Sequence, residues 1–202
     1  MSEITAVIFD VGNVMVRWEP RVIFEPHLKD SAELDWFMDQ VITMDWHKHH
    51  DAGLSFAEGV KNRSAEFPDY AHLISLFDSQ WDDTITGVIT ETIDCMKALK
   101  EAGIPMFGLT NFNGPKFQEF RKKYDFIDLL DDVVVSGDEK LIKPDPAIYD
   151  LILNRFNLIP EQTLFIDDSL DNIKAAEAKE IKTHHFTDPQ KLWPDLKRCG
   201  LL

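Results

Sequence analysis

The sequence predicts an α/β protein with a doubly wound parallel sheet and an inserted helical segment. Short apolar runs alternate with amphipathic stretches along most of the chain, as they do in successive β-α units. Several apolar runs end in polar residues, as expected at the edge of a parallel sheet where ligands bind. Between residues 18 and 87 this alternation is missing, and tryptophan and histidine are frequent instead.

The first predicted strand covers residues 6–9, four apolar residues without polar alternation. Such a run is typical of a strand covered on both faces. Asp10 follows directly. Because an unpaired carboxylate is costly to bury, Asp10 is expected at the carboxyl end of the strand, beside solvent or a ligand. Gly12 lets the backbone approach whatever Asp10 contacts. Taken alone, the motif also fits a loop aspartate that caps a turn.

Residues 18–87 are expected to form helices and no strand. Apolar residues recur at helical spacing after Ser31, which is expected to cap the first helix. Further helices are expected over residues 54–68 and 70–81. The aromatic residues of this segment are interpreted as its own core or as its packing against the main domain.

Helices and strands are predicted to alternate from residue 88 to residue 124. An amphipathic helix over residues 88–102 ends at Gly103, a common terminating residue. A strand over residues 105–111 ends in polar groups, and a helix over residues 114–124 carries a proline in its first turn.

The same alternation continues along the rest of the chain. A strand at residues 133–136 precedes a helix that Asp145 is expected to cap. A strand over residues 163–168 ends on two acids and precedes a helix rich in alanine and lysine, and a short strand at residues 183–186 and a helix at residues 189–198 follow. Strands that alternate with helices in this way form a parallel sheet with crossovers on both faces.

The composition limits the classes of partner. A hydrophobic content of 44% is enough for a substantial core, and a formal net charge of −15 argues against nucleic acid or an anionic membrane as a partner. Any anion site must be local, built from backbone N–H groups, a few cations or a metal. Cys95 and Cys199 give neither a disulfide framework nor a metal-ligand spacing. With no secretory signal or membrane-spanning run, a cytoplasmic location is expected.

Polar residues that follow the predicted strands, with one lysine from a nearby loop, form a candidate site. Carboxylates gathered at one edge repel each other unless a cation lies among them, and oxygen ligands without histidine or cysteine suit Mg²⁺. A nucleophilic aspartate, a hard metal, a hydroxyl and a lysine fit phosphoryl transfer through an aspartyl-phosphate. The residues concerned are Asp10, Thr110, Asn111, Lys143, Asp167 and Asp168.

With these residues the sequence resembles the haloacid dehalogenase-like hydrolase superfamily. Four ordered motifs of that superfamily are matched at residues 9–14, 109–111, 141–149 and 165–169. The resemblance implies a Rossmann-like sheet of strand order 3-2-1-4-5 with an α-helical cap inserted after the first strand. It divides the chain into a core domain of residues 1–16 and 88–202 and a helical cap of residues 17–87.

The same resemblance implies a role for each site residue. Asp10 would be the nucleophile and a ligand of Mg²⁺, with the Gly12 carbonyl as a backbone ligand. Asp168 would bind the metal directly and Asp167 would be its outer-shell partner. The residues implied to bind the phosphoryl group of a small phosphorylated substrate are Thr110, Asn111 and Lys143, of which Lys143 also neutralises charge during catalysis.

One position departs from the common pattern of the superfamily. Most of its phosphatases carry a second aspartate two residues after the nucleophile as general acid, and here that position is Gly12. The related subgroup with this glycine includes sugar-phosphate phosphatases. The expected activity is therefore a Mg²⁺-dependent phosphatase that favours sugar 1-phosphates, whose anomeric oxygen leaves without strong acid assistance.

Two other functions fit part of the pattern. A metal-independent 2-haloacid dehalogenase would use the same Asp10 to displace halide, although the paired acids Asp167 and Asp168 suit a Mg²⁺ site better. A non-catalytic phosphate-binding or aspartyl-phosphate switch module would also join acids, a threonine and a lysine on such a sheet. The long helical insert after the first strand argues against this second alternative.

Histidine and lysine cluster at residues 45–51 in the predicted cap. His47, His49 and His50 would suit a phosphate or a sugar if they faced the site, and a solvated surface segment is the alternative. Their spacing is not that of a zinc site.

Overall fold

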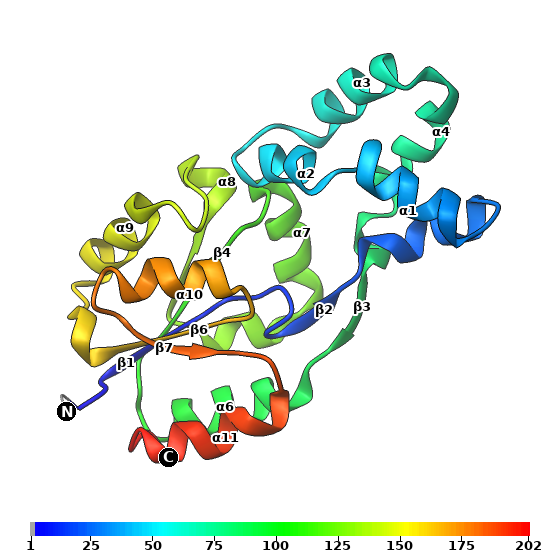
Figure 1. Cartoon of the computed structure of the whole chain (residues 1–202). Coiled ribbons are helices and arrows are strands. Elements are labelled where there is room, and N and C mark those ends of the chain that lie inside the picture. Colours follow the sequence, from blue (N-terminus) through cyan, green and yellow to red (C-terminus); the bar gives the residue numbers. More distant parts are fainter. Residues whose placement is uncertain (1–2) are drawn as a thin grey trace.

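A five-stranded parallel sheet forms the centre of the computed structural model, which describes residues 3–202 (Figure 1). Its order is β5-β4-β1-β6-β7, which becomes 3-2-1-4-5 when only these five strands are numbered along the chain. The implied order is therefore confirmed. The strands are β1 (Ala6–Phe9), β4 (Met106–Thr110), β5 (Asp132–Val135), β6 (Thr163–Asp167) and β7 (Lys182–His185).

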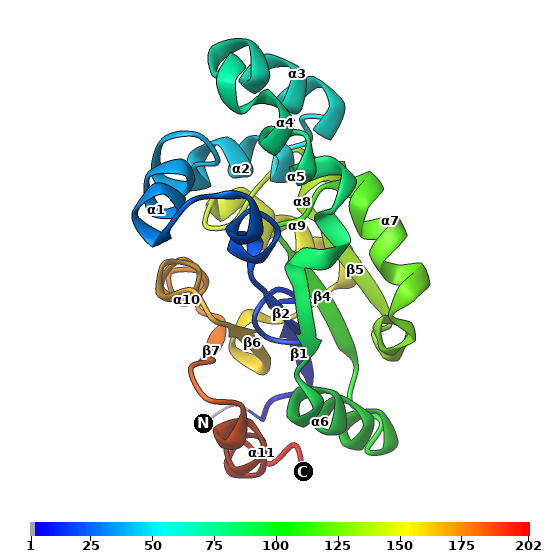
Figure 2. The ribbon, with the colours of Figure 1, turned by 90° about the vertical axis from the view of Figure 1, so that its right-hand side faces the viewer.

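Helices cover both faces of this sheet (Figures 1 and 2). Successive residues of a strand point to opposite faces, so Val7 and Phe9 pack in one layer and Ile8 in the other. Every residue of β1 is buried, which explains its uninterrupted apolar sequence. The layer of Val7 contains α6 (Thr90–Glu101), α7 (Gly114–Lys123) and α11 (Pro189–Arg198), and that of Ile8 contains α9 (Pro146–Phe156) and α10 (Leu170–Glu177).

Local sequence signals account for several of these helix ends. The Asp145 carboxylate accepts a hydrogen bond from the Ala147 N–H at 2.9 Å, so the predicted cap of α9 is confirmed. Gly103 has a φ of +72°, a conformation that favours glycine after the end of α6. Asn113 caps α7 and accepts a hydrogen bond from Lys116 N–H.

Two antiparallel strands connect the sheet to a helical unit, which we call the insert (residues 19–84). They are β2 (Val16–Trp18) and β3 (Ile85–Val88), and they carry the chain out of the core and back again side by side (Figure 1). The helices of the insert are α1 (Ser31–Gln40), α2 (Met44–Asp51), α3 (Phe56–Glu66), α4 (Ala71–Ile74) and α5 (Leu76–Ser79). A four-residue helix, α8 (Ser136–Glu139), follows β5, and single 3₁₀ turns lie at Pro20–Ile23, Glu25–His27, Pro68–Tyr70, Trp81–Thr84, Asp125–Leu129 and Pro160–Gln162.

The structure corrects four predicted details of this region. The expectation of no strand there was wrong, since β2 and β3 lie at its two ends. These strands are only three and four residues long, and their apolar residues merge with the neighbouring patterns, so the sequence did not reveal them. Val88 belongs to β3, and α6 begins at Thr90. Asp30, not Ser31, caps α1 by accepting a hydrogen bond from Glu33 N–H at 3.0 Å. The helix expected over residues 70–81 is broken into short turns.

Aromatic side chains of the insert pack on one another and on the core. The rings of Phe56 and Phe77 stack with centroids 4.8 Å apart. Trp81 continues this cluster to Phe112, a core residue whose ring centroid lies 4.9 Å from that of Trp81. The apolar interior of the insert is therefore continuous with that of the sheet's α6 side. This agrees with the interpretation of these aromatic residues as core.

Buried hydrogen bonds hold the end of α2 against the core. The Ser136 hydroxyl donates to the Asp51 carbonyl at 2.6 Å and accepts from the Phe112 N–H at 2.9 Å. The Asn113 side-chain amide donates to the carbonyls of His50 and Leu54 at 3.3 and 3.1 Å. Ser136 is fully buried, so these bonds fix the position of α2 over the carboxyl edge of the sheet.

Ser136→Ala is expected to lower the free energy of unfolding by about 1–3 kcal/mol, because buried backbone groups of Asp51 and Phe112 lose their partner. Chemical denaturation followed by circular dichroism measures this loss. Ser79 is a matched control, since its exposed hydroxyl also bonds a backbone carbonyl. Ser79→Ala should change stability by less than about 0.5 kcal/mol. If the two substitutions lowered the free energy of unfolding equally, the hydrogen bonds of Ser136 would not be holding α2 against the core.

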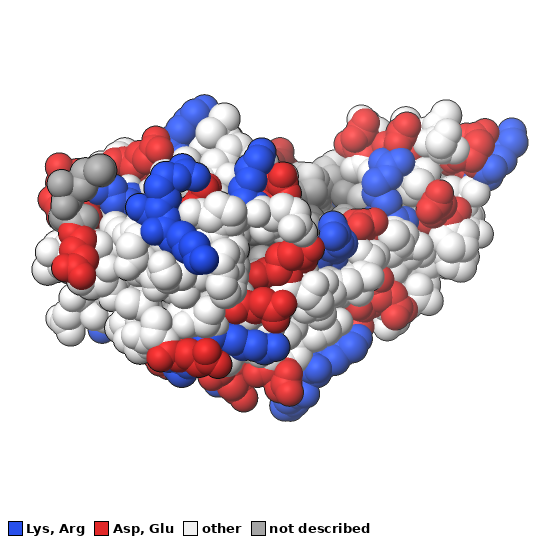
Figure 3. Space-filling view, turned by 90° about the horizontal axis from the view of Figure 1, so that it is seen from below, with Lys and Arg blue, Asp and Glu red and all other residues white. Residues whose placement is uncertain are grey.

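The surface carries charges of both signs. On the face shown in Figure 3, acidic and basic side chains are interspersed and no continuous basic area is visible. Among residues 3–202, no helix has both the length and the apolar character that crossing a membrane requires.

Candidate active site

The carboxyl edge of the sheet borders a cavity of about 400 Å³ between the core and the insert. Asp10 follows β1, Thr110 ends β4, and Asp167 and Asp168 lie at the end of β6. Lys143 reaches the same place from the loop before α9. Of the predicted site residues, those lining the cavity are Asp10, Gly12, Thr110, Asn111, Lys143 and Asp168, whereas Asp167 is fully buried beside it.

A buried lysine links two of the carboxylates. The Lys143 ammonium lies 2.9 Å from Asp10 Oδ2 and 2.7 Å from Asp167 Oδ2, and its side chain is almost fully buried. The other Asp10 oxygen accepts a hydrogen bond from the Val11 N–H at 2.7 Å. Burial raises the pKa of Asp10 to about 8 against the opposing charge of Lys143, and the neighbouring acids add to the rise.

Asp167 and Asp168 have different surroundings. Besides Lys143, Asp167 accepts hydrogen bonds from the Asn172 side-chain amide at 3.0 and 3.1 Å and from the Ser169 N–H at 2.8 Å. Its oxygens are thus occupied by the protein itself. The Asp168 carboxylate lines the cavity, where it accepts a bond from the Asn13 amide at 3.2 Å. Burial raises the pKa of Asp168.

The donor set fits a hard divalent cation. One oxygen each from Asp10, Asp167 and Asp168 lie within 4.8 Å of one another. When ionised, these three carboxylates and the single Lys143 ammonium sum to a charge of −2, which one divalent ion would neutralise. All of the side-chain donors are oxygens, as Mg²⁺ prefers. Of the groups concerned, Asp10, Asp168 and the backbone at Gly12 border the cavity, where they would be open to such an ion.

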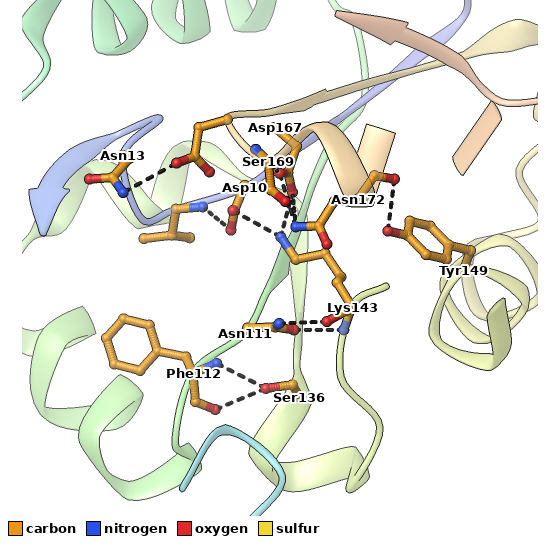
Figure 4. A network of polar contacts seen from close by, with 12 residues as sticks. Asp10, Asn13, Asn111, Phe112, Ser136, Lys143, Tyr149, Asp167, Ser169 and Asn172 are labelled. Carbon is orange, nitrogen blue, oxygen red and sulfur yellow. Dashed lines mark hydrogen bonds and ion pairs between the residues drawn. The ribbon is translucent and has the colours of Figure 1, made fainter. Parts of the chain in front are cut away.

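Asn111 supports the lysine loop. Its side-chain amide donates to the Lys143 carbonyl at 2.9 Å, and its side-chain oxygen accepts from the Lys143 N–H at 2.8 Å (Figure 4). This pair of bonds fixes the backbone from which the ammonium reaches Asp10. Thr110 is buried at the end of β4, where its side chain meets the cavity.

The insert forms the opposite wall of the cavity. The three clustered histidines on α2 have different surroundings. His47 and Asp51 lie one helical turn apart on α2 and line the cavity, with His47 Nε2 3.6 Å from Asp51 Oδ2. His50 is fully buried, with Nδ1 3.2 Å from the Leu54 carbonyl oxygen, and His49 is exposed. Only one of the three histidines therefore lines the cavity. Apolar side chains complete this wall, among them Trp18, Met44, Phe56, Trp81 and Ile85.

Several functional neighbours were not singled out from the sequence. Asn172 lies five residues after Asp167 in the first turn of the next helix, and this spacing is a usable signal. Asn13 has a φ of +54°, a turn conformation that asparagine tolerates, and it joins Asp168 to the Trp18 N–H. Asp51 follows His47 by four residues, so a helix at 44–51 would have placed both on one face.

The sheet is doubly wound and carries an aspartate directly after its first strand. A buried lysine and further acids lie at the same edge. This combination is a hydrolase-type site of the kind expected from the sequence. Residues 4–178 match the family model of haloacid dehalogenase-like hydrolases. The chain belongs to this family.

One relative is similar to this chain in sequence, and two solved structures share its fold. The sesquiterpene phosphatase astK of Aspergillus oryzae is 26% identical over 91% of this chain and 90% of its own length. A HAD family enzyme of Bacteroides thetaiotaomicron, solved with magnesium and inorganic phosphate, has a TM-score of 0.69 and 21% identity, covering 90% of this chain and 93% of the other. The L-2-haloacid dehalogenase of Xanthobacter autotrophicus has a TM-score of 0.63 and 13% identity, covering 89% and 76%.

Proposed function

We propose that this protein is a Mg²⁺-dependent phosphatase that hydrolyses a small phosphorylated metabolite through an aspartyl-phosphate on Asp10. The observation that carries the proposal is the Asp10 carboxylate at the cavity floor, 2.9 Å from a buried lysine and within the cluster of three acids. A phosphatase among the relatives and a structural neighbour solved with magnesium and phosphate support the same reaction. The helical segment of residues 17–87 would be the cap that closes the site.

Each residue has a distinct task in this reaction. One Asp10 oxygen attacks phosphorus while the bond from the Val11 N–H holds the other in place. Lys143 offsets the repulsion between the Asp10 carboxylate and the anionic phosphoryl group, and the Thr110 hydroxyl donates to a phosphoryl oxygen. Asp167 holds the Lys143 ammonium in position.

The same edge of the sheet would hold the metal. Asp10, Asp168 and the Gly12 carbonyl would hold Mg²⁺, with Asp167 in the outer shell, and the bound ion would supply positive charge for the phosphoryl oxygens. Asn13, through its bond to Asp168, orients one of these ligands.

Sugar 1-phosphates are the first substrates to test. With glycine at position 12, substrates whose leaving oxygen is weakly basic are favoured. Trp18 and Trp81 line the cavity, where their rings would pack on a sugar. The phosphate ester of an apolar alcohol is the second candidate class, because Phe56, Ile85 and Phe112 make much of the wall apolar. The sesquiterpene phosphatase relative supports this second class.

A phosphate-release screen with and without Mg²⁺ tests the proposed function. The purified protein should release phosphate from at least one monoester among sugar phosphates, aryl phosphates and isoprenyl phosphates, and EDTA should abolish the release. Chloride release from 2-chloropropionate in EDTA, without phosphatase activity in Mg²⁺, would instead identify a dehalogenase.

A further inference from the structure

The described residues of the core place no acid at position 12 to protonate the leaving group. Around Gly12, apart from its two neighbours in the chain, no atom lies within 4 Å of the place where a side chain would begin, so no other described residue occupies this position. Four carboxylates line the cavity within the described chain. Asp10 and Asp168 belong to the candidate metal cluster, and Asp171 is exposed on the first turn of α10. The fourth, Asp51, is on the insert.

Asp51 has the placement that an acid for the leaving group requires. It lines the cavity from α2 on the insert, whereas Asp10 lines it from the core, and its residue is only 6% exposed. The Ser136 hydroxyl fixes its backbone to the core at 2.6 Å. A leaving group that points from phosphorus toward the insert would therefore meet this carboxyl group.

His47 is the immediate neighbour of this carboxyl group. Its Nε2 lies 3.6 Å from Asp51 Oδ2, and its Nδ1 is buried without a hydrogen-bond partner among residues 3–202. The Trp18 ring packs on the imidazole with centroids 4.7 Å apart. Buried polar atoms normally have a hydrogen-bond partner. We therefore expect a bound molecule or a water to complete the hydrogen bonding of this nitrogen.

We propose that Asp51 is the general acid and base of the reaction, in place of an acid at Gly12, and that His47 is its positioning residue. The inference rests on the proposed phosphatase function. Asp10 attacks phosphorus, the bond from phosphorus to the leaving oxygen breaks, and that oxygen takes the Asp51 proton to leave as an alcohol. A water molecule then attacks phosphorus, and the Asp51 carboxylate removes a proton from that water. The Asp10–phosphorus bond breaks, which restores both carboxyl groups and releases phosphate.

The protonation states of the pair are consistent with this role. Burial raises the pKa of Asp51 to about 7, although the charge of Lys143 opposes the rise. Burial lowers the pKa of His47 to about 4. Near neutral pH the imidazole is therefore uncharged, and the carboxyl group is close to its midpoint, where a general acid is most effective.

The test compares aryl monophosphates of nearly equal size but different leaving-group basicity, p-nitrophenyl and phenyl phosphate, with benzyl phosphate as an alkyl ester. For the wild-type protein in Mg²⁺, kcat/KM should vary by less than about tenfold between the two aryl esters. Asp51→Asn should lower kcat/KM for benzyl phosphate by about 10²–10⁴-fold and that for p-nitrophenyl phosphate by less than about tenfold.

Asp45→Asn is the matched control, because it makes the same change on an exposed residue of the same helix and should preserve all three rates. Since Asp51 also activates water, the Asp51→Asn protein should release a burst of about one nitrophenol per site before a slow steady rate. His47→Gln should show the same leaving-group dependence more weakly. Asparagine avoids the cost of a buried ionised carboxylate, so this variant is expected to fold.

The outcomes separate this inference from the proposed function. Absence of phosphatase activity on every monoester in the wild-type protein would refute the proposed function itself. An active wild-type enzyme with a steep dependence on leaving-group basicity would overturn the role of Asp51, even if Asp51→Asn could not be purified. Equal loss on all three esters without a burst would also overturn it.

Discussion

Asp10→Asn is expected to lower phosphate release by about 10⁴-fold or more, because an amide oxygen is a far weaker nucleophile than a carboxylate. The fold should survive, since the amide has nearly the same shape and Lys143 retains its ion pair with Asp167 at 2.7 Å. Steady-state phosphate release in saturating Mg²⁺ measures the loss, and a denaturation curve checks the fold.

Asp171→Asn is the control for this substitution, since it removes a carboxylate from the same cavity at an exposed position. Its activity should stay within a few-fold of wild type. Retention of more than about a hundredth of wild-type activity by Asp10→Asn would contradict the nucleophile assignment, because loss of a nucleophile costs several decades.

The sheet edge of the site was predictable from the sequence. Parallel strands bring their carboxyl ends together, so Asp10, Thr110 and Asp168 meet even though they follow or end three different strands. Each follows or ends an apolar run that the chain cannot expose. Local signals, an aspartate and a glycine, likewise located the start of α9 and the end of α6.

The insert wall was not predictable in the same way. Which face of α2 meets the cavity depends on contacts across the chain, such as the Ser136 bond to the Asp51 carbonyl, 85 residues apart in sequence. No local pattern specifies such a contact. Met44 illustrates the difficulty, because its spacing matched the apolar residues of α1, yet it begins α2 and is 54% exposed.

The dehalogenase alternative meets an electrostatic difficulty at Asp168. Lys143 and Asn172 satisfy Asp167, so the paired acids are no longer equivalent. Asp168 lines the same cavity as Asp10, and its carboxylate accepts a hydrogen bond from the neutral amide of Asn13. One buried lysine thus faces three acids, an arrangement that is favourable with a divalent cation and costly without one.

Removal of Mg²⁺ is accordingly expected to abolish activity, and Asp168→Ala should reduce it more than Asp167→Ala does. In the proposed site Asp168 would bind the ion directly, so its loss should also raise the Mg²⁺ concentration needed for half-maximal activity. Loss of an outer-shell partner is typically worth about 10–100-fold. Asp167→Ala further removes the partner of Lys143, Asn172 and the Ser169 N–H, so its larger effect should be on stability.

Two measurements separate these roles: phosphate release as a function of Mg²⁺ concentration, and the free energy of unfolding in EDTA. Asp168→Ala should shift the first and leave the second near wild type, whereas Asp167→Ala should lower the free energy of unfolding because it leaves a buried lysine with one carboxylate fewer. Calcium, which is larger and tolerates looser coordination, is a useful comparison ion and should support less activity. If Asp168→Ala kept full activity and needed no more Mg²⁺ for half-maximal activity, the metal would have to bind elsewhere. The two acids would then only support Lys143.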